Sequence, residues 1–166
     1  MADCLYHIYT DGGSIGNPGP GGYGVVLLWG KTRQEFSGGY RLTTNNRMEL
    51  MAAIVGLGAT PENSRVRLYA DSRYLVDGMN KGLAEGWRAN RWKKANKRTA
   101  LNIDLWKIVL SLCEVRQVEF IWVAGHAGNK ENERCDWLSR QAAARKNLPP
   151  DTGYETEQTR QASLFG

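Results

Sequence analysis

Residues 5–29 read LYHIYTDGGSIGNPGPGGYGVVLLW, and this stretch decides the fold. Residues 5–10 are rich in Tyr and Ile, and residues 23–29 are almost entirely apolar, so both are predicted to be β-strands. Glycine and proline crowd the segment between them, residues 12–22, which predicts a turn. A loosely alternating pattern over residues 34–42 predicts a third strand. Three strands with short connections indicate an antiparallel meander.

Beyond the third strand, the apolar positions change to helical spacing, with short strands between the helices. Helices are predicted over residues 48–57, 72–80, 104–113 and 130–145, and strands over residues 66–70 and 118–123. Each of these two strands is reached through a helix, which favours parallel pairing. The sequence therefore predicts a three-layer α/β domain on a mixed five-stranded sheet, three strands antiparallel and then two parallel, flanked by helices.

The composition is that of one globular domain of 166 residues, with 42% hydrophobic and 23% charged residues. No apolar run approaches the ~20 residues that cross a bilayer, and no signal peptide is recognisable at the start. The three cysteines cannot all pair, and they lack the Cys-x-x-Cys spacing of a zinc finger. We expect a monomer in the reducing cytoplasm, with no membrane association.

The folded domain of the chain is expected to span residues 1–147. Pro149 and Pro150 end the last helical pattern, and residues 152–163 are polar with little apolar content. Residues 148–166 are therefore predicted to form a flexible C-terminal tail.

Positive charge is concentrated in residues 81–98, called the basic segment below. It holds seven basic residues and one acidic residue in a chain whose net charge is +5. Trp87 and Trp92 are interleaved with these charges. Localised positive charge beside aromatic rings suits a nucleic-acid backbone. The alternative is a solvated helix face, which charge runs usually form.

Four acidic residues stand where strands or helices would direct them to one place. Asp11 follows the first predicted strand and Asp71 follows the fourth, and neighbouring strand ends form sites in open α/β sheets. Glu49 begins a helical stripe whose next residues are all small, which lets that helix approach the sheet closely. Asp136 lies one turn after Asn132 on the last predicted helix, so the two share a face.

Each acid also fits a local structural role when it is taken alone. These roles are a turn at Asp11, a capping box of Asn46 with Glu49, a helix cap at Asp71, and an ion pair of Asp136 with Arg140. Gathered at one point, four carboxylates would repel one another unless divalent cations neutralised them. Oxygen ligands suit Mg²⁺ or Mn²⁺ better than zinc, and two such ions about 3.5–4 Å apart would serve phosphodiester cleavage.

The chain contains two histidines. His7 lies inside the first predicted strand, which indicates a structural role. His126 lies in a glycine-containing loop, residues 124–129, next to the helix that carries Asp136. An imidazole in that loop is either incidental or a proton carrier near neutral pH.

The chain resembles bacterial type 1 ribonuclease H over residues 6–154. The matching motifs are TDGGSIGNPGPGGYG from Thr10, TTNNRMELMAA from Thr43, DS-x-Y from Asp71, N-x-DLW from Asn102, WV-x-GHAG-x-x-ENERCD from Trp122 and DTGY from Asp151. Six motifs in this order, with the four acids in register, form a specific pattern. The resemblance implies an endonuclease that cuts the RNA strand of an RNA–DNA hybrid and leaves 5′-phosphate and 3′-hydroxyl ends.

The same resemblance implies roles for individual residues. The family's ligands of two Mg²⁺ ions correspond to Asp11, Glu49, Asp71 and Asp136, and its proton-handling histidine corresponds to His126. Its RNA-contacting residues correspond to Asn17, Asn45 and Asn46, and its phosphate pocket to Thr44 and Asn102. Its DNA-contacting protrusion corresponds to residues 86–97 with Trp87, where we expect phosphate contacts from Lys93, Lys94 and Lys97.

Three positions depart from the family pattern. Arg73 stands where Gln is familiar, which exchanges a groove hydrogen bond for a phosphate contact. Leu83 stands where a Trp is expected early in the protrusion, beside an apparent one-residue insertion. Leu42 stands where an Arg often supports the phosphate pocket, although Arg41 is adjacent. These departures concern hybrid affinity and leave the expected metal ligands intact.

Two other functions stay open at this point. A transposase-like or integrase-like enzyme would share a carboxylate cluster, but it would lack the TTNNRME run and the basic segment. A hybrid-binding module without activity would not need all four acids together with His126.

The end of the chain, residues 161–166, reads QASLFG. It resembles the Gln-x-Ser/Asp-Leu-Phe peptide with which bacterial replication and repair proteins dock on the sliding clamp. In such docking, Leu164 and Phe165 would fill an apolar pocket and Gln161 would form hydrogen bonds. The alternatives are a disordered end or a tail that folds back onto the domain.

Overall fold

The computed structural model describes residues 4–165, which contain a five-stranded sheet of strand order β3-β2-β1-β4-β5. The strands are β1 (Leu5–Ser14), β2 (Gly19–Trp29), β3 (Thr32–Thr43), β4 (Arg65–Ala70) and β5 (Gln117–Trp122). Strands β1, β2 and β3 pair antiparallel, whereas β4 pairs parallel with both β1 and β5. The predicted mixed sheet is therefore confirmed.

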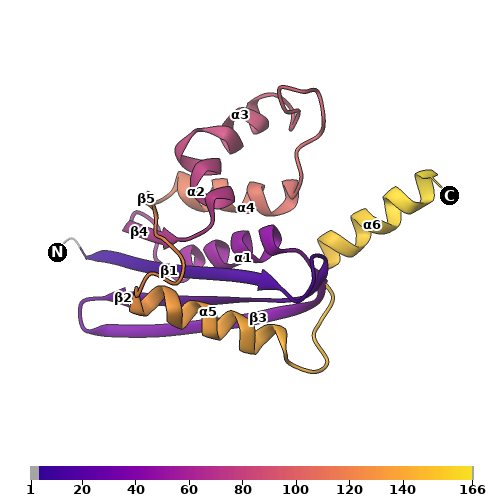
Figure 1. The fold of residues 1–166 in the computed structure, drawn as a ribbon. Coiled ribbons are helices and arrows are strands. Elements are labelled where there is room, and N and C mark those ends of the chain that lie inside the picture. Colours follow the sequence, from indigo (N-terminus) through magenta and orange to yellow (C-terminus); the bar gives the residue numbers. More distant parts are fainter. Residues whose placement is uncertain (1–3, 166) are drawn as a thin grey trace.

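Helices cover both faces of this sheet (Figure 1). They are α1 (Asn45–Gly58), α2 (Arg73–Asn80), α3 (Leu83–Ala89), α4 (Ile103–Glu114), α5 (Lys130–Ala143) and α6 (Thr152–Phe165). Helix α1 packs on β1 and β2 and also contacts α4, whereas α5 packs on β1, β2 and β3 from the other face. The three-layer α/β architecture is thus the predicted one. Within the described residues, every helix is too short or too polar to span a membrane.

The main hydrophobic core lies between the sheet and the layer of α1, α2 and α4. Ile8 of β1, Leu50 of α1 and Trp106 of α4 are fully buried in it. A smaller cluster on the opposite face joins Val26 of β2 to Cys135 of α5. The sheet is therefore anchored from both sides, which holds the ends of its central strands in place.

The glycine-rich stretch mostly continues the sheet and does not form the long turn predicted for residues 12–22. Strands β1 and β2 together include most of it. A Cβ atom on Gly12 would lie 2.4 Å from the carbonyl carbon of Met48 in α1. A Cβ atom on Gly24 would lie 2.4 Å from the carbonyl oxygen of Cys135 in α5. Glycine is required because both helices approach the strands closely, and this approach also carries their acidic residues toward β1.

The basic segment forms α3 and the loop that follows it, at one side of the domain (Figure 1). Ala84 is buried, and the ring of Trp87 packs edge-on against Trp106 with their centroids 6.0 Å apart. The charged side chains of the segment are exposed. Its apolar residues therefore attach it to the core, while its cations face outward.

The C-terminal segment, expected to form a flexible tail over residues 148–166, is helical over Thr152–Phe165 in the described part of the chain. Helix α6 begins beside Asp151, whose carboxylate accepts a hydrogen bond from the Tyr154 backbone N–H at 3.3 Å. Arg41 of β3 forms an ion pair with Glu155 at 3.0 Å. No described α6 side chain is buried, and the helix extends away from the domain (Figure 1). Hydrophobic patterning did not indicate α6 because capping and ion pairs, rather than an apolar face, support it.

Candidate active site

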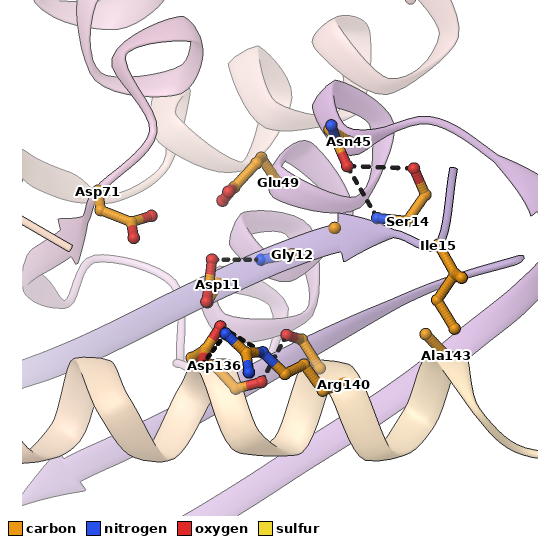
Figure 2. Close-up of a pocket in the computed structure, with 12 residues that line it drawn as sticks. Asp11, Gly12, Ser14, Ile15, Asn45, Glu49, Asp71, Asp136, Arg140 and Ala143 are labelled. Carbon is orange, nitrogen blue, oxygen red and sulfur yellow. Dashed lines mark hydrogen bonds and ion pairs between the residues drawn. The ribbon is translucent and has the colours of Figure 1, made fainter. Parts of the chain in front are cut away.

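Carboxylates from separate elements meet at one edge of the sheet. Asp11 on β1, Glu49 on α1 and Asp71, directly after β4, each place a carboxylate oxygen within 4.8 Å of the others. Asp136 on α5 lines the same open cavity of about 560 Å³. Figure 2 shows the four carboxylates around a common space. The structure therefore brings together the four acids that the sequence singled out.

Parallel pairing sets the two aspartates side by side. Thr10 of β1 is opposite Ala70 of β4. Asp11 and Asp71 are the next residues after this pair. Because the two strands are parallel, the two aspartates lie next to each other. Ser72 is the N-cap of α2, so the alternative role of Asp71 as a helix cap is wrong. The Asp71 carboxylate therefore does not cap the helix, and Asp71 lines the cavity.

Glu49 lies just beyond the first turn of α1, which begins at Asn45. The N-cap is Thr44, so the capping box of Asn46 with Glu49 does not form. A Cβ atom on Gly56, further along the same helix, would lie 2.6 Å from Cγ2 of Ile8 in β1. The predicted close approach of this helix to the sheet is thereby confirmed, and it buries Glu49 to 8% exposure.

Asp136 lies between an arginine and another acid. Its carboxylate forms the predicted ion pair with Arg140, one helical turn on, at 3.2 Å. On its other side it interacts with the carboxyl group of Asp11. Asp11 accepts the backbone N–H of Gly12 at 2.9 Å, within a continuous strand, so its alternative role in a turn is wrong.

Burial and mutual repulsion make the cluster hard to ionise fully. Burial, together with the charge of Asp71, raises the pKa of Asp11 to about 7. Burial also raises the pKa of Glu49 well above its ordinary value, and burial raises the pKa of Asp71. Without a cation, the cluster therefore holds protons near neutral pH that ordinary carboxylates have lost.

The donor set fits a divalent cation. Glu49 Oε2 is buried and has no hydrogen-bond partner among the described residues. Leaving a buried polar atom without a partner costs about 1–3 kcal/mol, and a bound cation would remove that cost. The candidate ligands are all carboxylate oxygens, which hard cations such as Mg²⁺ prefer. Asp11, Glu49 and Asp71 could therefore hold such an ion.

Amide side chains lie beside the carboxylates, and Figure 2 shows Asn45 next to Ser14 at the cavity. Asn45 Oδ1 accepts hydrogen bonds from the backbone N–H and the hydroxyl of Ser14, at 2.8 and 3.1 Å. Asn17 Oδ1 accepts the backbone N–H of Asn45 at 3.1 Å. Because both oxygens are occupied, Asn17 and Asn45 present their NH₂ groups as donors. Asn46 follows and is exposed.

Thr44 and Asn102, the predicted phosphate pocket, both contact Arg47. The Thr44 hydroxyl accepts the Arg47 backbone N–H at 3.2 Å, and Asn102 Oδ1 accepts a guanidinium N–H of Arg47 at 3.4 Å. Arg47 is only 4% exposed and forms ion pairs with Asp104 and Asp151 at 2.7 and 2.8 Å. Sequence analysis missed this arginine, although its place in the first turn of a largely buried helix was an available signal.

The loop after β5 lies against the cluster. A Cβ atom on Gly125 would lie 2.7 Å from Oδ2 of Asp71, and the next residue, His126, is exposed. The guanidinium carbon of Arg73 lies 3.8 Å from the centroid of the Trp122 ring, and Trp122 Nε1 donates to the Asp71 backbone carbonyl at 3.2 Å. An imidazole and a guanidinium are therefore available near Asp71.

Two other sets of predicted residues lie outside the cavity. Lys93, Lys94 and Lys97 are exposed on the basic segment, and Lys93 Nζ donates to Thr99 Oγ1 at 3.2 Å. At the far end of α6, Leu164 and Phe165 are 70% and 90% exposed. The structure does not bring either set to the carboxylates.

Relatives in sequence point to a single family. The RNase H family model matches residues 4–144. A "Ribonuclease H" of Syntrophus aciditrophicus is 60% identical over 147 residues, which are 89% of this chain and 85% of that protein. A "Ribonuclease H" of Trichodesmium erythraeum is 60% identical over 148 residues, covering 89% and 94% of the two chains.

Solved structures share the fold. LC9-RNase H1, described as a type 1 RNase H with the type 2 active-site motif, has a TM-score of 0.77 at 31% identity, over 89% of this chain and 76% of that chain. LC11-RNase H1, solved in complex with an RNA/DNA hybrid, has a TM-score of 0.60 at 25% identity, over 83% and 96%. Because the family match and the relatives cover most of its length, this chain belongs to the RNase H family.

Proposed function

We propose that this chain is an endonuclease that hydrolyses the RNA strand of RNA–DNA hybrids and leaves 5′-phosphate and 3′-hydroxyl ends. The observation that carries the proposal is the group of three carboxylate oxygens within 4.8 Å of one another, with a buried oxygen of Glu49 left unpartnered. A divalent cation held there suits phosphodiester hydrolysis. The complex of LC11-RNase H1 with a hybrid supports the choice of substrate.

Cleavage of a hybrid labelled on its RNA strand tests this proposal directly. We expect internal cuts in the RNA of the hybrid when Mg²⁺ is present, and no cuts in duplex DNA or when EDTA is added. Cleavage of duplex DNA would favour the transposase-like or integrase-like alternative. Binding of the hybrid without any cleavage would favour the inactive module.

The proposed cofactors are two Mg²⁺ ions, with Mn²⁺ as an alternative. They would be held by carboxylate oxygens of Asp11, Glu49, Asp71 and Asp136. When bound, such ions stabilise the attacking and leaving oxygens of the phosphodiester displacement. The chain's contribution is to fix its carboxylates on packed elements, so that little rearrangement is needed when charge develops.

His126 is the proposed proton carrier. Hydrolysis joins a water oxygen to phosphorus and breaks the bond from phosphorus to the 3′ oxygen. One proton must therefore leave the water, and one must reach the 3′ oxygen. The exposed imidazole of His126 acts electrostatically on Asp71 and is open to solvent, so it can pass such a proton between the site and water.

Replacing this imidazole should slow the reaction without stopping it. We expect His126→Ala to lower kcat by about 10²-fold, the low end of the range for an acid–base group, because water can reach an exposed site. The measurement is kcat on a labelled hybrid across the neutral pH range, with the melting temperature as the check on folding. Turnover equal to that of the wild type at every pH would remove His126 from the mechanism.

Recognition of the RNA strand is assigned to three amides at the start of α1 and in the turn before β2. The NH₂ groups of Asn17 and Asn45 are free to donate, and a minor groove offers 2′-hydroxyl and base acceptors to such donors. Asn46, exposed beside them, completes the set. The proposed phosphate contacts are Thr44, Asn102 and the stacked guanidinium of Arg73.

The basic segment, with Trp87, is proposed to bind the DNA strand, and its lysines supply a test. Neutralising Lys93, Lys94 and Lys97 together should weaken hybrid binding, and each lost phosphate contact should reduce the slope of log K against log salt by about 0.7–0.9. Binding is measured in EDTA, so that the hybrid stays intact. Lys31→Ala, in the turn between β2 and β3, is the single-charge control. An unchanged slope in the triple variant would mean that these lysines face solvent.

The end of α6 is proposed to dock on a sliding clamp, as a segment distinct from a catalytic domain of residues 1–147. Support comes from Leu164 and Phe165, which are 70% and 90% exposed on a helix that buries no described side chain. Deleting residues 161–166 should leave hybrid cleavage unchanged and abolish binding to the clamp of the same organism, measured by calorimetry. A full-length chain without affinity for that clamp would contradict the proposal. A lower melting temperature after deletion would indicate a structural role.

We also propose that the chain works as a monomer in the cytoplasm. All three cysteines are free thiols. Burial raises the pKa of Cys113 to about 12 and also raises that of Cys135, so neither is a reactive thiolate near neutral pH. These properties suit a reducing compartment.

A further inference from the structure

Arg140 is a basic side chain that lines the carboxylate cavity, and the proposed function gives it no role. It stands one turn after Asp136 on α5, so both side chains lie on the same helix face. Figure 2 shows its guanidinium joined to the Asp136 carboxylate at the border of the cluster.

The contact has the form of a fork. Arg140 Nε donates to Asp136 Oδ1 at 3.2 Å, and a terminal guanidinium nitrogen lies 3.2 Å from Asp136 Oδ2. Both carboxylate oxygens of Asp136 are therefore engaged by one arginine. The Arg140 side chain is 67% exposed and that of Asp136 is 26% exposed, so the arginine can leave without opening the core.

Asp136 differs from the other three acids of the site in its distance from them and in its ion pair with Arg140. Asp11, Glu49 and Asp71 bring oxygens within 4.8 Å of one another, and Asp136 is not part of that group. Its carboxylate lines the same cavity but is held by a protein cation. A divalent ion that used Asp136 would have to take an oxygen from Arg140, and the two cations would also repel each other.

We propose that Arg140 is a built-in counter-ion, which occupies the Asp136 carboxylate in the metal-free protein and must release it before a divalent cation can bind there. Arg140 is thus a positioning residue that acts through Asp136 and sets how tightly the site holds metal. This inference rests on the proposed metal site. An ordinary helix-surface ion pair would contribute a little helix stability and would leave metal affinity unchanged.

Binding of Mn²⁺ alone, without hybrid, separates these two roles. Free Mn²⁺ is measured by electron paramagnetic resonance at constant ionic strength. We expect the Mn²⁺ dissociation constant of Arg140→Gln to be about three- to tenfold lower than that of the wild type, because a competing and repelling cation is gone. Arg140→Lys, which keeps the charge but loses the fork, should lie between the two.

Arg160→Gln is the matched control. Arg160 forms a helix ion pair with Glu157, also at 3.2 Å, and its side chain is 69% exposed, far from the cavity on α6. Arg160→Gln removes the same charge from an exposed helix ion pair, so the Mn²⁺ dissociation constant of this variant should equal that of the wild type. Equal tightening in both variants would mean a general charge effect and would overturn the inference.

The route through Asp136 is tested in an Asp136→Asn background. There, adding Arg140→Gln should leave Mn²⁺ binding nearly unchanged, because the carboxylate for which the cations compete is absent. A full three- to tenfold effect in that background would overturn the proposed route. An unchanged dissociation constant in Arg140→Gln alone would overturn the inference and leave the proposed metal site standing. Absence of Mn²⁺ binding in the wild type would overturn both.

Discussion

Asp11→Asn is expected to lower hybrid cleavage by at least about 10³-fold, the largest effect on activity of any single change in this chain. Asp11 lies at the centre of the cluster, with a carboxylate oxygen within 4.8 Å of those of Glu49 and Asp71. A neutral amide in its place forfeits several kcal/mol of charge stabilisation by bound metal, and each 1.36 kcal/mol of barrier is tenfold in rate. The measurement is kcat/KM on a labelled hybrid at saturating Mg²⁺.

Asp77→Asn is the control for this change. Asp77 lies on α2, shortly after Asp71, and forms only a loose ion pair with Lys81 at 3.5 Å. It removes the same charge from the same region without touching the cluster, so activity should stay near that of the wild type. Near-normal turnover in Asp11→Asn would contradict the assignment of the active site.

Asp11→Asn should also stabilise the metal-free protein. Burial raises the pKa of Asp11 from its ordinary value of 3.8 to about 7, so between these values the folded state binds the proton that the unfolded state has released. Stability of the wild type must then fall as the pH rises through this window. We expect Asp11→Asn to show a shallower fall and to be more stable by about 1–3 kcal/mol at pH 7. Urea unfolding in EDTA at several pH values measures both quantities, and an unaltered pH dependence would contradict the argument.

Arg47→Met is expected to lower the free energy of unfolding by about 3–5 kcal/mol, the largest effect on stability. The Arg47 guanidinium is 4% exposed and binds the carboxylates of Asp104 and Asp151 at 2.7 and 2.8 Å. Asp151 is itself buried and accepts a hydrogen bond from the Thr43 hydroxyl at 2.7 Å. Without the arginine, Asp151 becomes a buried charge that has lost its main partner, and such groups are strongly destabilising.

Urea unfolding of Arg47→Met measures this cost. Arg67→Met is the matched control, because Arg67 forms an exposed ion pair with Glu119 at 3.2 Å. That pair should contribute no more than about 0.2–1 kcal/mol. A cost for Arg47→Met as small as that of the control would show that the network is not an important source of stability.

The order of strands and helices could be predicted from local patterns in the sequence. Alternating and continuous apolar runs predicted the five strands, and helical spacing predicted α1, α2, α4 and α5. The short links between the first three strands and the helical links to β4 and β5 predicted the pairing directions as well. The small residues after Glu49 also predicted that α1 would lie close to the sheet, as Gly56 against Ile8 now does. These features depend on neighbours in sequence, so the sequence by itself determined them.

Features that depend on distant partners could be decided only by the tertiary structure. Glycines are typical of a turn, but most of those in residues 12–22 lie in β1 and β2, and at Gly12 and Gly22 the backbones of α1 and α5 leave no room for a Cβ atom. The choice between capping roles and a common cluster for Asp71 and Glu49 was open until Thr44 and Ser72 were seen to cap the two helices. Arg47 binds Asp151, which is 104 residues away in the sequence. Asp151 in turn accepts a backbone hydrogen bond at the start of α6. Local pattern carries no information about such pairs, because their free energy arises only when the folded chain buries both partners together.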